Sequence, residues 1–144
     1  MTGICAITGG ASGIGRGTAE RFLADGWRVI ALDVAEAPLA AMKKELFSHG
    51  DKLETAVCDV TSADSVSRTF EEIGKRHGRL NGLVCSAGLL RIGSLESMPV
   101  EDFDALFCVN VRGLWLAARE AMRVHIAQWN RLNRDVAEAD DRPA

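Results

Sequence analysis

Tyrosine is absent from the 144-residue chain, and lysine is absent after Lys75. Without a phenol, the chain cannot use any mechanism in which a tyrosine moves a proton. The net charge is only −3, which excludes the strongly basic surface of a nucleic-acid-binding protein or of a protein held on an anionic membrane. No apolar run approaches the ~18 residues of a membrane span. We therefore expect no nucleic-acid partner and no membrane association.

The chain also lacks the residue spacing of a metal site. Its four cysteines, Cys5, Cys58, Cys85 and Cys108, form no C-x-x-C pair, and no histidine stands at ligand spacing. All four lie in apolar runs, so we expect reduced, buried thiols and no metal. The N-terminal residues MTGICAITGG have no basic segment before the first apolar run, which argues against a signal peptide. These features predict a cytoplasmic protein.

Strand and helix signals alternate along most of the chain. Apolar runs predict buried strands at 3–8, 28–33, 53–60 and 80–88. Apolar spacing, with glycine and proline at the ends, predicts helices at 14–25, 37–50 and 62–78 and a two-part helix at 99–122. Within that last helix we expect a packed face of Phe107, Leu114, Trp115 and Leu116. The alternation predicts an α/β fold, a Rossmann-like, doubly wound parallel sheet that is incomplete, with about four strands and flanking helices.

The last residues, HIAQWNRLNRDVAEADDRPA, break this alternation, because they are polar and aperiodic and supply no fifth strand. We therefore predict a dinucleotide-binding domain at 1–124 and a divergent, irregular or poorly ordered tail at 125–144. Without a fifth strand, the apolar strand at 80–88 becomes a sheet edge, and such an edge favours association. We expect a homo-oligomer or some other self-association.

The stretch TGGASGIG, at residues 8–15, has the features of a phosphate-binding loop. Its glycines Gly9, Gly13 and Gly15 follow a predicted strand and open a predicted helix. Glycine permits a tight turn and lets a pyrophosphate approach the backbone, and the first N–H groups of the helix then face the anion. The alternative is a plain glycine turn, but the strand–turn–helix setting favours a dinucleotide site.

Asp33 ends the second predicted strand, where this fold places the acidic residue that accepts hydrogen bonds from an adenosine ribose. A 2′-phosphate at that position would meet a carboxylate, and like charges ~4 Å apart near a surface repel by ~4 kcal/mol. No arginine or lysine stands at 32–37 to offset this repulsion. The sequence therefore predicts NAD as the preferred cofactor over NADP. The alternative is a solvated carboxylate at a strand end.

Together these motifs resemble those of the short-chain dehydrogenase/reductase family. TGGASGIG is similar to its T-G-x-x-x-G-x-G loop, CDV (58–60) to its D-V after the third strand, and NVRG (110–113) to its N-V-x-G helix start. CSAG (85–88) is similar to its N-N-A-G, with Cys85 and Ser86 replacing two asparagines. The resemblance covers residues 3 to about 124 and implies hydride transfer between NAD and a small-molecule alcohol or carbonyl. It implies Asn110 as a catalytic-tetrad member and a cofactor site made of Gly9, Ser12, Gly13, Ile14, Gly15, Asp33, Asp59, Val60, Ala87 and Gly88.

The resemblance stops before the family's other catalytic residues. The family also needs a serine after a fifth strand and a Y-x-x-x-K pair, in which the lysine lowers the pKa of the tyrosine that moves the proton. We therefore expect a truncated cofactor-binding portion of an NAD-dependent oxidoreductase, inactive by itself. The alternatives are a non-catalytic NAD-binding or regulatory module and an interaction fragment that folds only with a partner. For Asn110 the alternative is a buried helix asparagine that bonds a water or a backbone group.

A shifted reading frame after residue 127 is one hypothesis for the tail. Residues 128–136, QWNRLNRDV, can be written in codons that read NGIVSIAT one base later. That reading resembles the family's fifth strand, G-x-I-V-N-I-x-S, with threonine in place of the catalytic serine. The alternative is a genuinely divergent terminus, and the coding sequence decides between the two.

Overall fold

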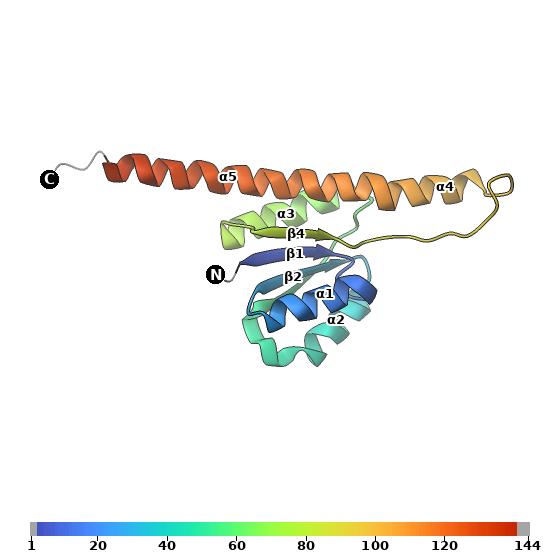
Figure 1. Cartoon of the computed structure of the whole chain (residues 1–144), viewed down its shortest axis with the longest axis horizontal. Helices are drawn as coiled ribbons and strands as arrows, with labels where there is room; N and C mark the ends of the chain where they lie inside the picture. Colours follow the sequence, from blue (N-terminus) through green and yellow to red (C-terminus); the bar gives the residue numbers. More distant parts are fainter. Residues whose placement is uncertain (1–2, 141–144) are drawn as a thin grey trace.

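The computed structural model describes residues 3–140 of the chain. Four parallel strands form one sheet, and the three that Figure 1 labels point the same way. Their order across the sheet is β3-β2-β1-β4. The strands are β1 (Ile4–Thr8), β2 (Arg28–Asp33), β3 (Leu53–Val57) and β4 (Gly82–Cys85). The α/β fold with a four-stranded parallel sheet is thus confirmed.

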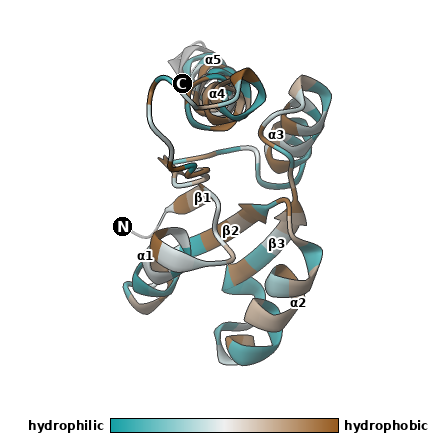
Figure 2. Ribbon diagram, turned by 90° about the vertical axis from the view of Figure 1, so that its right-hand side faces the viewer, coloured by the Kyte–Doolittle hydropathy of each residue, from teal (hydrophilic) through white to brown (hydrophobic). Residues whose placement is uncertain are grey.

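Helices cover both faces of the sheet, as Figure 2 shows, with α1 and α2 on one side and α3 and α5 on the other. Each side has its own apolar core, with Leu23, Leu39 and Met42 in one and Phe70 and Leu116 in the other. The helices are α1 (Gly13–Ala24), α2 (Glu36–Glu45), α3 (Ala63–His77), α4 (Val100–Phe107) and α5 (Leu114–Asp140), with a 3-10 segment at Phe47–Lys52 and a π-helical segment at Cys108–Gly113.

The helix ends follow the signals in the sequence. Ser62 caps α3, because its hydroxyl accepts a hydrogen bond from the N–H of Ser65 at 3.2 Å. Gly78 ends the same helix in the left-handed conformation, with φ +65°, which glycine adopts without strain. Pro99 stands immediately before α4, and the π-helical segment divides α4 from α5, as the expected two-part helix requires.

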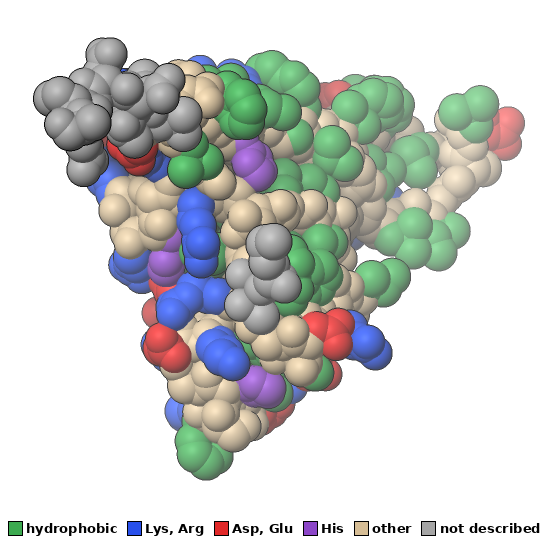
Figure 3. Space-filling view, turned by 60° about the vertical axis from the view of Figure 1, so that its left-hand side comes forward, with side chains coloured by type: hydrophobic (Ala, Val, Ile, Leu, Met, Phe, Trp, Pro, Cys, Tyr) green, Lys and Arg blue, Asp and Glu red, His purple; other side chains and the backbone are tan. Residues whose placement is uncertain are grey.

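An ion-pair network ties the end of α3 to the amino end of the sheet. The carboxylate of Glu54, on β3, pairs with Arg28 and Arg76 at 2.9 Å and with His77 at 3.1 Å. Although burial acts to raise the pKa of Glu54, the hydrogen bonds from the two arginines and from His77 lower it below its ordinary value. Figure 3 shows cations interspersed with acidic and histidine side chains on the face of the molecule that it presents.

β4 lies at an edge of the sheet in the described residues, as the missing fifth strand predicts. All four of its residues are only half-buried, whereas every residue of the central strand β1 is buried. The apolar edge expected from the sequence is therefore present.

The tail differs from the irregular chain that the sequence analysis expected. Helix α5 crosses residue 124 without a break and continues to Asp140. Residues 114–140 contain no glycine or proline and are rich in alanine and arginine, which favour helix. The segment also carries an apolar stripe at helical spacing, Met122, Ile126, Trp129 and Leu132, which predicts a helix although all four side chains are more than half exposed. The division into a domain at 1–124 and a separate tail stays a prediction.

The expected packed face of the two-part helix is wrong for three of its four residues. Leu116 is buried against the sheet, but Phe107, Leu114 and Trp115 are more than half exposed. The buried side of α5 is set by Leu116, Ala117, Ala121 and Val124, which lie at helical spacing. The neighbouring position Trp115 is rotated by about 100° from Leu116 and faces away from the core.

Candidate functional site

A cleft of about 610 Å³ lies at the carboxyl ends of the strands. Residues that directly follow or end β1, β2, β3 and β4 all contribute to it, and in a parallel sheet this edge is where ligands bind. Nine of the ten predicted cofactor residues line the cleft, namely Gly9, Ser12, Gly13, Ile14, Asp33, Asp59, Val60, Ala87 and Gly88. Segments that are far apart in the sequence thus meet at one cleft, as the motifs predicted for a cofactor site.

Gly15, the tenth predicted residue, lies behind the cleft and shapes the glycine loop. A Cβ atom at Gly15 would lie 2.1 Å from the carbonyl oxygen of Gly9. Gly9 itself has φ +65°, and a Cβ there would lie 2.7 Å from the backbone nitrogen of Ala87. Both glycines are therefore required by close backbone approach, which brings the loop against the start of α1 and the end of β4.

The amino end of α1 presents unused backbone donors to the cleft. Ser12 precedes the helix but makes no side-chain capping hydrogen bond, and the first turn contains no acidic residue. The N–H groups of Gly13, Ile14 and Gly15 stand in the first turn, where no intrahelical acceptor exists. A Cβ on Gly13 would meet nothing within 4 Å, so the loop is open on this side. These residues fit the pyrophosphate of a dinucleotide.

Two apolar side chains in the cleft are unusually exposed for their type. Ile14 is 84% and Val34 is 66% exposed, and both line the cleft. Val34 directly follows Asp33 at the end of β2, and Ile14 stands at the start of α1. Exposed apolar side chains that line a cleft mark places where apolar parts of a ligand can pack.

Asp33 is held in place by two backbone donors. Its Oδ2 accepts a hydrogen bond from the N–H of Ala11 at 3.2 Å, and its Oδ1 accepts one from the N–H of Ala35 at 3.1 Å. The carboxylate thereby links the glycine loop to the turn after β2 and stays at the rim of the cleft. Its position fits the recognition of a ribose hydroxyl.

Asp59 and Val60 form the wall of the cleft after β3. The Oδ1 of Asp59 accepts hydrogen bonds from the N–H of Thr61 at 2.8 Å and from its hydroxyl at 2.7 Å, which fixes the turn. Val60 contacts the backbone at Gly113, where a Cβ would lie 2.9 Å from the valine Cγ2. This contact packs the wall against the start of α5.

Asn110 holds the chain that leaves β4. Its Oδ1 accepts from the N–H of Leu89 at 2.8 Å, and its Nδ2 donates to the carbonyl oxygen of the same residue at 2.9 Å. The side chain thus bonds a backbone group, as the alternative to a catalytic role predicted. That alternative also predicted a buried residue, whereas Asn110 is exposed. A role in catalysis stays a prediction.

The end of β4 is tied to β1 despite the two substitutions in CSAG. The N–H of Ser86 donates to the carbonyl of Thr8 at 3.1 Å, and the N–H of Ala87 donates to the hydroxyl of Thr8 at 3.3 Å. Burial raises the pKa of the Cys85 and Cys58 thiols. Neither thiol therefore supplies a thiolate nucleophile at neutral pH.

Sequence reasoning missed several residues that also line the cleft: Val34, Cys58, Thr61, Ser86, Leu89 and Val109. Each lies within one or two residues of a predicted position. The rule that ligands bind at the carboxyl ends of parallel strands would have found those that follow β2, β3 and β4, but it gives no signal for Val109, which approaches from the π-helical segment.

Two observations on the described residues concern metal binding and membrane association. In the described part of the chain, no group of three or more His, Cys, Asp or Glu side chains is placed to hold a metal ion. None of the helices between residues 3 and 140 combines the length and apolar character needed to cross a bilayer.

Residues 4–130 match the family model described as short chain dehydrogenase. The chain is 35% identical over 127 residues to the 3-oxoacyl-[acyl-carrier-protein] reductase FabG of Thermotoga maritima, which covers 88% of this chain and 52% of the relative. It is 38% identical over 130 residues to the human 3-oxoacyl-[acyl-carrier-protein] reductase, covering 89% and 53%. The crystal structure of an actinorhodin polyketide ketoreductase variant with NADPH has a TM-score of 0.81 at 25% identity, covering 85% and 47%.

The chain thus spans about half the length of these relatives. The matched region contains the glycine loop, the cleft and Asn110, and its sequence and its fold point to the same family. This chain belongs to the short-chain dehydrogenase family.

Proposed function

We propose that this chain binds NAD in the cleft at the carboxyl ends of its strands. The observation that carries the proposal is the amino end of α1, where uncapped N–H groups face a cleft that also contains the carboxylate of Asp33. The loop would hold the pyrophosphate, Asp33 the adenosine ribose, and Asp59 and Val60 would flank the adenine. The exposed side chains of Ile14 and Val34 would be covered by the cofactor.

The choice of NAD over NADP rests on charge. Among the described residues that line the cleft, only Asp33 and Asp59 carry a charge, and both are acidic. No described lining residue therefore offers a cation to a 2′-phosphate. The solved ketoreductase is in complex with NADPH, so the fold by itself does not exclude a 2′-phosphate. The preference therefore depends on the side chains of this chain and not on its fold.

Isothermal titration calorimetry of the folded chain tests the proposal. We expect NAD to bind with a 1:1 stoichiometry, weakly, and NADP to bind at least about a hundredfold more weakly, because ~4 kcal/mol of repulsion at ~4 Å corresponds to nearly a thousandfold. Absence of binding by either dinucleotide, in a sample whose circular dichroism shows the folded state, contradicts the proposal.

The parent reaction would be hydride transfer between NAD and an alcohol or carbonyl, for which the bound nicotinamide supplies the hydride chemistry. In this chain Asn110 would position the segment after β4 beside the nicotinamide, by holding both backbone groups of Leu89.

The unpaired cysteines of the described residues agree with a cytoplasmic location.

The chain by itself should turn over no substrate, because it contains no tyrosine to move the proton. We expect no NADH above background when the purified chain is incubated with NAD and a panel of secondary alcohols. The matched control is a full-length relative prepared in the same way. Steady NADH production that follows the chain through a second chromatographic step would overturn this expectation, whereas binding without turnover favours an NAD-binding module.

We also propose self-association through the edge of β4, since half-buried apolar residues end the sheet there. Sedimentation velocity should show species above 15.5 kDa that increase with concentration. Val84→Lys should reduce them, because a charge on an edge strand opposes pairing. Val57→Lys, at the opposite edge on β3, is the control. A single 15.5-kDa species at high concentration, or equal effects of both variants, contradicts association through β4.

A further inference from the structure

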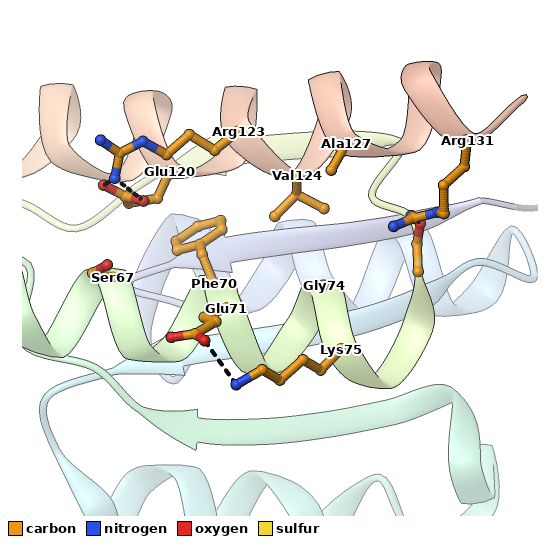
Figure 4. Close-up of a pocket in the computed structure, with 11 residues that line it drawn as sticks. Ser67, Phe70, Glu71, Gly74, Lys75, Glu120, Arg123, Val124, Ala127 and Arg131 are labelled. Atoms are coloured by element: carbon orange, nitrogen blue, oxygen red, sulfur yellow. Dashed lines mark hydrogen bonds and ion pairs between the residues drawn. The ribbon is translucent and has the colours of Figure 1, made fainter. Parts of the chain in front are cut away.

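A second hollow lies between α3 and the middle of α5, outside the cofactor cleft (Figure 4). Its volume is about 640 Å³, and the two cavities share none of the lining residues that the structure describes. Phe70, on α3, and Val124, on α5, form its floor, and both side chains are buried. The floor is therefore apolar and belongs to the core beneath the two helices.

Small residues keep this groove open. Gly74 on α3, Gly78 at the end of that helix and Ala127 on α5 all line the hollow. A Cβ at Gly74 would lie 3.6 Å from the Cγ2 of Val124, which is ordinary contact. Close packing of the two helices therefore does not require glycine at this position, even though glycine weakens a helix relative to alanine. The absence of a side chain here leaves space above Val124.

A buried carboxylate anchors one end of the groove. The Nη1 of Arg123 lies 2.8 and 2.9 Å from the two carboxylate oxygens of Glu120, and the Nη2 of Arg119 lies 2.9 Å from the same carboxylate. The Glu120 side chain is only 6% exposed. Two guanidinium groups thus share one buried carboxylate, but Arg119 does not line the groove, so Arg123 and Glu120 leave this end of the lining neutral. On the opposite wall, Lys75 and Glu71 neutralise each other at 2.7 Å.

The other end of the groove carries Arg131. Its Nη2 donates to the carbonyl oxygen of Gly78, at the end of α3. None of the carboxylates whose side chains the structure describes pairs with it. Arg131 stands eight residues after Arg123, or about 12 Å along α5. Figure 4 shows both arginines on α5 with Val124 and Ala127 between them.

We propose that this groove binds a small amphiphilic anion, with its carboxylate on Arg131 and its apolar body over Val124, Ala127 and Phe70. A planar guanidinium matches a carboxylate with two parallel hydrogen bonds. An apolar lining with a few polar groups at fixed points is the usual composition of a small-molecule site. Arg131 leaves the lining with a net positive charge, which disfavours a cation, and the apolar floor disfavours a small polar anion.

Decanoate, used below its micellar concentration, is the probe, and the whole chain is titrated by calorimetry. We expect decanoate to bind, and decanol to bind at least about tenfold more weakly because it lacks the carboxylate. Arg131→Gln should weaken decanoate binding by about tenfold. Arg134→Gln, on the same helix but not among the lining residues, should leave it unchanged within about twofold. Gly74→Leu should abolish binding because its side chain fills the hollow.

Each variant is also titrated with NAD, whose affinity should not change, since the two cavities share no described lining residue. Retained NAD binding shows that a variant is folded, and it separates failure of this site from failure of the proposed function. If NAD does not bind, thermal melting shows whether the variant is folded. Equal affinity for decanol and decanoate, equal losses in Arg131→Gln and Arg134→Gln, or undiminished binding by folded Gly74→Leu would each overturn the proposal.

Discussion

Replacing Gly15 with alanine is expected to abolish measurable NAD binding and to destabilise the chain. The new Cβ would lie 2.1 Å from the carbonyl oxygen of Gly9, a backbone atom that cannot rotate away. Relief requires the glycine loop to move, and overpacking of this kind costs about 1–3 kcal/mol. The same movement displaces the uncapped N–H groups of α1, and each charge-assisted hydrogen bond lost there weakens binding by about 1.5–3 kcal/mol.

Gly17 provides the matched control, because it lies two residues further along the same helix and a Cβ there meets nothing within 4 Å. Gly17→Ala should raise the stability by up to about 1 kcal/mol, the difference in helix propensity, and leave NAD affinity unchanged. Urea unfolding and calorimetry measure the two effects. If Gly15→Ala binds NAD as well as Gly17→Ala does, the backbone approach seen in the structure is not what shapes the site.

The order and type of the strands and the first three helices could be predicted from the sequence because local signals and core packing agree there. The apolar runs of β1 and β2 are buried on both faces, and the Ser62 and Gly78 signals mark the two ends of α3. Parallel strands then bring their carboxyl ends together, so the motif residues after each strand had to meet. Most of the cleft follows from that one geometric rule.

The direction in which side chains face along α4 and α5 could not be predicted. Apolar residues occur on several sides of this helix, so Trp115 and Phe107 looked as suited to the core as Leu116. Which side is buried depends on where α3 and β4 lie, and that is tertiary information. The same holds for Val109 in the cleft and for Asn110, whose contacts with Leu89 depend on the π-helical segment that joins the two helices.

The interpretation of the chain end as irregular overlooked the signals for α5. Residues 125–135 continue the helix with little burial to support it. Their apolar residues Ile126, Trp129 and Leu132 stand at helical spacing but are exposed, and helix propensity with the absence of glycine and proline adds only weak signals. Arg131, on this part of the helix, then reaches Gly78, a contact between residues 53 positions apart that no local pattern could reveal.

Asp33→Asn is expected to remove most of the discrimination between NAD and NADP. The asparagine is nearly isosteric with aspartate, and its amide oxygen can still accept the hydrogen bond from either Ala11 or Ala35. The substitution therefore removes the negative charge while keeping the turn close to its original form. Since ~4 kcal/mol of repulsion at ~4 Å is lost, the NAD to NADP affinity ratio should fall by about two to three orders of magnitude.

Asp33→Arg should go further and favour NADP, because a guanidinium binds a phosphate with paired hydrogen bonds. Its NAD affinity should fall as well, since Ala11 and Ala35 lose their shared acceptor. Glu36→Gln, which removes an exposed carboxylate three residues further along the chain, is the control and should leave the ratio unchanged within about twofold. Calorimetric titrations of the four proteins at one ionic strength give the ratios directly, and raising the salt should shrink the discrimination of the unmodified chain. An unchanged ratio in Asp33→Asn, or an equal change in Glu36→Gln, would place the adenosine ribose away from Asp33. The charge of Asp33 would then have no part in the choice between the two dinucleotides.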